Sequence, residues 1–315
     1  MKKTFILLLQ VLFFNSILLA QQTWSQVASI SKLGRNVAIS FTLNGKAYAG
    51  LGENKSGTRL NDFWEFNPAT NSWTQKADYP GGGKYAATAF IANGKAFVGL
   101  GESSSAISQK DLWEYIPSTD KWVRKTDFPG AARYGSSCFV IGDTAFVGTG
   151  SSGSPPYLSD MWMYVASTDA WTKKANFPGG ARTGGIAFTI AKNGFMGTGF
   201  QNSTTVLSDI WRYNKSTDTW TAMSNYGGSG IMGAVSFVLK NKGYVGTGYN
   251  LTSRVKDFYE YDVSANSWTK LDSIPSSFGA RHSATAFAIN DIGYIGTGQL
   301  TSNLTTIDFW SYNPY

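Results

Sequence analysis

Cysteine and histidine are almost absent from this chain of 315 residues, which contains one of each, Cys138 and His282. A single cysteine cannot form an intrachain disulfide, so the fold must be stabilised by its core or by closure of its architecture. The same scarcity excludes a zinc site of the usual His/Cys kind. No G-x-S-x-G turn, P-loop or EF-hand loop occurs either. We therefore expect no metal and no other cofactor.

Charge is also scarce, since charged residues make up 15% of the chain and hydrophobic residues 42%. This balance is typical of a chain with a large core and excludes extensive disorder. The formal net charge of +7 is compatible with a nucleic-acid partner. The cations are scattered, however, and no run of Lys and Arg occurs. We therefore expect no nucleic-acid partner.

The first twenty residues differ from the rest of the chain. Lys2 and Lys3 precede an apolar run over residues 5–14, and Ala20 is the small residue at the expected cleavage position. This pattern predicts a secretory signal peptide over residues 1–20. A membrane anchor is the alternative, but the apolar run is short for a span. We expect a secreted or periplasmic bacterial protein without a membrane span after cleavage, whose single domain covers residues 21–315.

The rest of the chain contains six similar copies at a period near 50 residues. An aspartate precedes an aromatic residue in every copy, at Asp62, Asp111, Asp160, Asp209, Asp257 and Asp308. The second glycine of a GLG or GTG triplet recurs at Gly52, Gly101, Gly150, Gly199, Gly248 and Gly298. A period of this length, built from short strands, is typical of a propeller.

Each copy contains the signals of four strands. In the first copy, a strand around Phe41 leads through an Asn-Gly turn into a second strand, KAYAGLG. A polar loop separates it from a third strand, DFWEF, and a fourth strand begins at Trp73. Trp64 and Phe66 point to one face of the third strand and Phe63 to the other. A strand that is apolar on both faces is covered on both, as in blades stacked around an axis.

The sixth copy ends at DFWSYNPY and lacks its tryptophan strand. The segment QTWSQVA, with Trp24, supplies such a strand at the other end of the chain. We therefore predict an all-β fold: one six-bladed propeller of four-stranded blades. The N-terminal strand around Trp24 would complete the last blade and close the ring, which leaves only short, protected sheet edges.

A glycine triplet after the second strand, followed by an aromatic residue and then a tryptophan seven positions later, as in Tyr115 and Trp122, resembles the kelch repeat. Kelch repeats usually have adjacent glycines, whereas Thr149 intervenes in Gly148-Thr149-Gly150. The resemblance implies a kelch propeller, a scaffold that serves many functions. It extends to the propeller of galactose oxidase, but the copper centre of that enzyme needs two histidines, so this chain cannot have that activity.

One position before the first strand of each copy is strongly biased to cations: Arg35, Lys84, Arg133, Arg182 and Arg281, with Ile231 in the fifth copy. We expect these side chains to surround one mouth of the central channel. In kelch domains that bind peptides, matching arginines help to contact acidic ligands, and the resemblance implies a candidate anion site here. The alternative is structural: each cation pairs with the repeated aspartate and braces adjacent blades.

The next position contains Asn36, Tyr85, Tyr134, Thr183, Met232 and His282. Aromatic rings beside cations suit sugars or planar anions, so Tyr85, Tyr134 and His282 are further candidate ligand-binding residues. The alternative is that these side chains only line the channel. Glu53 and Glu102 occupy matching positions in adjacent long loops, but nothing in the sequence distinguishes them from surface residues. No catalytic residue is predicted.

The long loops and interblade connections fall on one face of the predicted propeller, and function is expected there. We expect a non-enzymatic, monomeric binding module whose partner is a glycan, an anionic small molecule or a protein. The alternative is a metal-free carbohydrate isomerase, because the chain resembles N-acetylneuraminate epimerase, an exported six-bladed kelch propeller. Such chemistry needs an acid/base group and a cation for the carboxylate of the sugar acid. The ring of Arg35, Arg133, Arg182 and Arg281 would supply the cation, and Glu53, Glu102 or His282 the base, although no catalytic residue of that family is matched by position.

Overall fold

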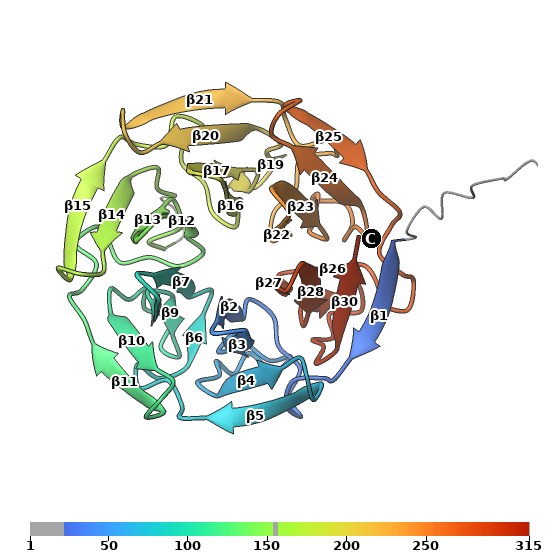
Figure 1. The fold of residues 1–315 in the computed structure, drawn as a ribbon, viewed down its shortest axis with the longest axis horizontal. Helices are drawn as coiled ribbons and strands as arrows, with labels where there is room; N and C mark the ends of the chain where they lie inside the picture. The colour runs from blue at the N-terminus through green and yellow to red at the C-terminus, as the bar shows by residue number, and fades with distance from the viewer. Residues whose placement is uncertain (1–21, 154–156, 315) are drawn as a thin grey trace, which may run out of the picture.

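A computed structural model describes residues 22–153 and 157–314, and within these ranges it contains thirty strands and no helix. Six four-stranded antiparallel sheets surround a central axis (Figure 1). The predicted six-bladed propeller is confirmed. The expected signal peptide, residues 1–20, lies outside the described residues.

The first five blades follow the chain from the axis outward. Blade 1 consists of β2 (Ile39–Leu43), β3 (Lys46–Gly50), β4 (Phe63–Asn67) and β5 (Ser72–Lys76). Blade 2 consists of β7 (Thr88–Ala92), β8 (Lys95–Gly99), β10 (Leu112–Ile116) and β11 (Lys121–Arg124). Blade 3 consists of β12 (Ser137–Ile141), β13 (Thr144–Gly148), β14 (Met161–Val165) and β15 (Ala170–Lys174). Blade 4 consists of β16 (Ile186–Ile190), β17 (Asn193–Gly197), β20 (Ile210–Asn214) and β21 (Thr219–Met223). Blade 5 consists of β22 (Val235–Leu239), β23 (Lys242–Gly246), β24 (Phe258–Asp262) and β25 (Ser267–Lys270).

Blade 6 is built from both ends of the chain. Its strands are β27 (Thr285–Ile289), β28 (Ile292–Gly296), β30 (Phe309–Asn313) and, outermost, β1 (Thr23–Val27), as Figure 1 shows. Trp24 lies opposite Tyr312 in the β1–β30 register, with ring centroids 4.8 Å apart. It also contacts Phe258 of blade 5 at 5.3 Å. The N-terminal strand therefore holds the first and last segments of the described chain together.

Contacts between consecutive blades explain why the sequence repeats. Tyr115 of blade 2 packs edge-on against Phe63 of blade 1 at 4.9 Å, and Trp122 does so at 5.0 Å. The indole N–H of Trp122 also donates to the carbonyl of Ala77, 2.9 Å away. Asp120 accepts hydrogen bonds from the Tyr115 hydroxyl and the Ala77 N–H. A residue that serves one blade boundary is needed again at the next, so the same types recur.

The repeated Gly-x-Gly triplet fixes where each long loop begins. The φ of Gly52 is +87°, and a Cβ at this position would lie 2.4 Å from the carbonyl oxygen of Asn36. Only glycine tolerates both conditions. The close approach lets Glu53 and Asn36 exchange two backbone hydrogen bonds of 3.0 and 3.1 Å. The triplet thereby brings the start of each long loop beside the residue that precedes the first strand.

Candidate functional site

The five predicted cations are buried in ion pairs with the repeated aspartate of their own blade. Arg35 Nη1 and Nη2 lie 2.6 and 2.7 Å from the two carboxylate oxygens of Asp62, and Nη1 also donates to the carbonyl of Leu51 at 3.2 Å. The indole N–H of Trp64 donates to the same carboxylate at 2.7 Å. The equivalent pairs are Lys84–Asp111, Arg133–Asp160, Arg182–Asp209 and Arg281–Asp308.

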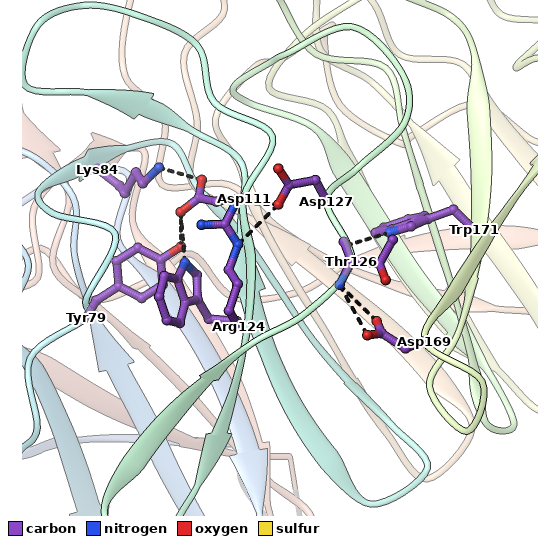
Figure 2. Close-up of polar contacts among 9 residues, drawn as sticks. Tyr79, Lys84, Asp111, Arg124, Thr126, Asp127, Asp169 and Trp171 are labelled. Carbon is purple, nitrogen blue, oxygen red and sulfur yellow. Dashed lines mark hydrogen bonds and ion pairs between the residues drawn. The ribbon is translucent and has the colours of Figure 1, made fainter.

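Blade 2 achieves the same pairing with different residues. Lys84 Nζ lies 2.7 Å from one oxygen of Asp111, and the Tyr79 hydroxyl donates to the other at 2.8 Å (Figure 2). An ammonium is a compact charge, whereas a guanidinium presents a fork of donors that matches both carboxylate oxygens. The tyrosine hydroxyl therefore supplies the second donor that lysine lacks. Burial lowers the pKa of Lys84 and raises that of Tyr79.

Blade 5 lacks this pair because Ile231 occupies the position of the cation. Asp257 pairs instead with Lys270 Nζ at 2.9 Å, from the outermost strand. The hydroxyl of Tyr226, which corresponds to Tyr79, is buried without a hydrogen-bond partner. Blade 5 is therefore the natural contrast to blade 2 within one molecule.

The geometry of the cations fits the bracing alternative better than the anion site. The side chain of Arg35 has 0% of its surface exposed and that of Arg182 1%, and both are occupied by carboxylate and carbonyl oxygens. Among the described residues, the cavity at the mouth is lined by the neighbouring position in the sequence and not by these cations. Ligand binding by Arg35, Lys84, Arg133, Arg182 and Arg281 stays a prediction that no observation tests.

The aromatic candidates do line the mouth. A cavity of about 360 Å³, which we call the cup, is lined by Tyr85, Tyr134, Tyr157, Thr183, Phe200, Met232 and His282, with small residues between them. The rings of Tyr85 and Tyr134 meet edge to face at 5.8 Å, as do those of Tyr157 and Phe200 at 5.7 Å. A second cavity of about 260 Å³ lies along the channel, and Ala38 and Ala87 line both. The sequence identified Tyr85, Tyr134 and His282 but not Tyr157 or Phe200.

A larger cavity of about 570 Å³ lies beside Trp113, at the outer part of blade 2. Three of its four charged side chains are paired, because Asp111 contacts Lys84 at 2.7 Å and Arg124 Nε donates to Asp127 at 3.1 Å (Figure 2), whereas Lys110 has no ion pair within the described residues. The Arg124 guanidinium also lies 5.2 Å from the Trp113 ring centroid. We consider the cup the stronger candidate because it lies at the mouth of the channel and is lined by residues from all six blades.

Three positions in each blade are joined by backbone pairing near the mouth, and we call them the rim; seven of these eighteen residues line the cup. They are joined by backbone pairing, such as Tyr134 with Ser151 and Ser151 with Tyr157. Paired residues on antiparallel strands point to the same side, although Ser151 and Asn36 are themselves buried. In blade order the rim contains Asn36, Glu53, Arg59; Tyr85, Glu102, Ser108; Tyr134, Ser151, Tyr157; Thr183, Phe200, Val206; Met232, Tyr249, Arg254; and His282, Gln299, Thr305.

The acidic part of the rim belongs to blades 1 and 2. Arg59 donates to Glu102 through Nη2, and its Nε lies 3.7 Å from a carboxylate oxygen of Glu53. The Arg59 guanidinium also lies 5.7 Å from the ring centroid of Tyr85. Burial, and then the charge of Glu53, raises the pKa of Tyr85 to about 12. Two carboxylates share one cation here, so this part of the rim has a formal charge of −1.

The basic part of the rim belongs to blades 5 and 6. Arg254 Nε donates to His282 Nδ1 at 3.0 Å, and Nη2 donates to the side-chain oxygens of Gln299 and Asn303, each at 2.9 Å. No carboxylate pairs with Arg254 in the described part of the chain. Burial, and then the charge of Arg254, lowers the pKa of His282 to about 4. The imidazole is therefore neutral at pH 7, and because Nδ1 accepts, its proton is on Nε2.

Arg254 was missed by the sequence reasoning, although Arg59 occupies nearly the same position in the first long loop. As for a metal, no group of three or more His, Cys, Asp or Glu side chains in residues 22–153 and 157–314 could hold an ion. No helix in these ranges is long and apolar enough to cross a membrane.

Comparison with known proteins identifies the family of the chain. The Attractin/LZTR1 beta-propeller family matches residues 96–306, whereas no curated protein matches the sequence significantly. A solved structure entitled "Structure of YjhT" resembles this one with a TM-score of 0.75 and 16% sequence identity, over 89% of this chain and 95% of that chain. At this identity the likeness concerns the fold alone. Because the family match covers well over half of the sequence, the chain belongs to the Attractin/LZTR1 family of kelch-type beta-propellers.

Proposed function

We propose that this protein is a binding module, without enzymatic activity, that holds its ligand in the cup on the long-loop face. One observation carries the proposal: the six copies agree at the aspartate and at the Gly-x-Gly triplet, and they differ at the rim. Every copy keeps its aspartate and its glycine triplet, whereas no two blades have the same three rim residues. The six copies are similar at positions that build the ring and differ at positions that would contact a ligand.

The chemistry of the cup supports a small polar ligand with a planar or apolar face. Its volume of about 360 Å³ is in the range of small-molecule sites. Aromatic rings on several sides offer stacking, and hydroxyls offer hydrogen bonds. Within the described residues, no side chain or backbone group bonds the hydroxyls of Tyr85 and Tyr134. A glycan, an anionic small molecule or a side chain of a protein partner would fit this description.

The surroundings of the candidate bases favour binding over catalysis. The Nδ1 lone pair of His282 already accepts a hydrogen bond from Arg254, and both Glu53 and Glu102 lie against Arg59. The metal-free isomerase remains the second candidate, because Arg254 could hold the carboxylate of a sugar acid at the edge of the cup. Acceleration of mutarotation by the purified protein would establish that alternative, and the binding proposal expects none.

Export forms part of the proposal and rests on the sequence of residues 1–20. Sequencing the N-terminus of protein recovered from outside the cytoplasm should give a start near Gln21. Recovery of the uncleaved chain from the cytoplasm would contradict export without affecting the proposed site.

The proposed function is tested by thermal melting against neutral glycans, acidic sugars and short peptides. A ligand at about 100 times its dissociation constant should stabilise the protein by roughly 2.7 kcal/mol. The shift should disappear in Tyr85→Ala and Tyr134→Ala. It should persist in Val123→Ala, which removes an exposed side chain of the outermost strand of blade 2. A shift that survives both tyrosine substitutions would place the ligand elsewhere.

A further inference from the structure

The rim has opposite charges in two separate places, and neither is neutralised within the described residues. Blades 1 and 2 provide Glu53 and Glu102 against the single cation Arg59. Blades 5 and 6 provide Arg254, whose bonding partners His282, Gln299 and Asn303 are all neutral. No other rim position is charged. None of these charged side chains lines the cup itself, but each group contacts a residue that does: Arg59 lies 5.7 Å from the ring centroid of Tyr85, and Arg254 donates to His282. A formal −1 and a formal +1 therefore lie next to the lining of one cup.

We infer that the cup takes a zwitterion: a small molecule with an ammonium group at Glu53 and Glu102 and a carboxylate at Arg254. This inference rests on the proposed function and specifies the class of its ligand. A guanidinium without an acidic partner binds a carboxylate through charge-assisted hydrogen bonds, and a pair of carboxylates binds an ammonium in the same way.

The separation of the two charges selects the length of the ligand. Arg254 reaches from blade 5 to His282 of blade 6, and Arg59 reaches from blade 1 to Glu102 of blade 2. Blade 6 is adjacent to blade 1, since the Val37 N–H donates to the carbonyl of Ser283 at 2.8 Å. Packed sheets lie about 10 Å apart. An extended peptide spans about 3.3–3.6 Å per residue, so a ligand that crosses one blade spacing needs about three residues, and free-ended peptides of three and four residues are the ones to test.

The remainder of the cup suits an apolar side chain between the two ends. Tyr157 and Phe200 meet edge to face on blades 3 and 4, and Met232 of blade 5 also lines the cup. The inferred ligand is therefore a short peptide with both termini free and an apolar or aromatic residue between them. A single amino acid is too short to reach both charges.

The test is calorimetric titration of the purified protein with Ala-Phe-Ala and Ala-Phe-Ala-Ala. Each peptide is used with free ends, with an acetylated N-terminus, with an amidated C-terminus and with both ends blocked. Blocking either end of the better peptide should weaken binding at least tenfold. Free phenylalanine should bind more weakly than either peptide.

Two charge-neutral variants assign each end of the ligand to its partner. In Glu53→Gln/Glu102→Gln, acetylation should no longer weaken binding, while amidation still does. In Arg254→Gln the pattern should reverse. The matched controls are Asp291→Asn and Lys192→Gln, exposed residues of hairpin turns away from the rim, and they should behave like the wild type. Unchanged melting temperatures would show that each variant is folded.

The outcomes separate this inference from the proposed function. If blocked peptides bind as tightly as free ones, the zwitterion is wrong. If no peptide binds but a glycan or acidic sugar stabilises the protein through Tyr85 and Tyr134, the inference is wrong and the proposed function stands. If no compound of either panel binds in a way that depends on these tyrosines, both are wrong.

Discussion

Removing the Tyr79 hydroxyl group from blade 2 should show how much the hydrogen bonds around a buried ion pair contribute to the free energy of unfolding. In Tyr79→Phe, one oxygen of Asp111 loses a donor at 2.8 Å, while Lys84 still holds the other. Hydrogen bonds to charged groups contribute about 1.5–3 kcal/mol, and the indole N–H of Trp113 still reaches the same oxygen at 3.1 Å. We therefore expect Tyr79→Phe to lower the free energy of unfolding by about 1.5 kcal/mol, the lower end of that range.

The Tyr79 hydroxyl compensates for the second donor that Lys84 lacks, and this can be tested by replacing the lysine with an arginine. Adding Lys84→Arg to Tyr79→Phe recreates the arginine–phenylalanine arrangement of blade 3, where Arg133 pairs with Asp160 and Phe128 replaces the tyrosine. The double variant should regain most of the lost stability, so the two substitutions should couple favourably by about 1 kcal/mol. The free energy of unfolding is measured from urea denaturation.

Blade 5 supplies the control for this series. Tyr226→Phe is the same chemical change at the corresponding position, but the Tyr226 hydroxyl is buried without a partner. Removing an unsatisfied buried group should leave stability unchanged or raise it by about 1 kcal/mol. Equal destabilisation by Tyr79→Phe and Tyr226→Phe would refute the argument, because the loss would then reflect packing and not the aspartate contact.

Three further predictions follow from the same structure. Trp24→Ala should lower the free energy of unfolding by about 3 kcal/mol, because the truncation leaves a cavity at a blade boundary, and Trp73→Ala at the corresponding place in blade 1 should have the same effect. A much smaller loss for Trp24→Ala, measured by urea denaturation, would show that β1 does not stabilise the closed ring. The pKa of His282 in the folded protein is lowered to about 4 from an unfolded value near 6.5, so its contribution to stability is complete above pH 6.5 and is lost as the pH falls toward 4. The melting temperature of His282→Gln should therefore vary less than that of the wild type across this range, and parallel curves would contradict the assignment. Burial raises the pKa of the Cys138 thiol, so it should react with a thiol reagent at pH 8 far more slowly in the folded protein than in urea; equal rates would mean that the thiol lies in open solvent.

The sequence was sufficient for the fold because the determinants of the ring are repeated. Phe63, Tyr115 and Trp122 form one blade boundary, and residues of the same kinds form the others. A pattern that must satisfy the same contact several times is visible at a fixed period, so blade number and strand order could be predicted. The pairing of Asp62 with Arg35 was available as an alternative for the same reason.

The candidate site was harder to predict because it lies where the repetition ends. Neighbouring residues such as Arg35 and Asn36 point in different directions, and the period alone does not show which of them faces the mouth. Tyr157, Phe200 and Arg254 come from long loops, and their place on the rim depends on backbone pairing between segments distant in the sequence. Only the three-dimensional structure brings these segments together.

The central claim is that rim residues bind the ligand, whereas the buried cations stabilise the blades. One measurement compares these two roles directly. Melting temperature and ligand-induced shift are determined for Tyr85→Ala and Tyr134→Ala beside Arg133→Ala and Arg182→Ala. We expect the tyrosine variants to melt near the wild type and lose the shift. The arginine variants should melt much lower and keep the shift. Arginine variants that melt normally and lose the shift would contradict the account and restore the arginine ring as the binding site.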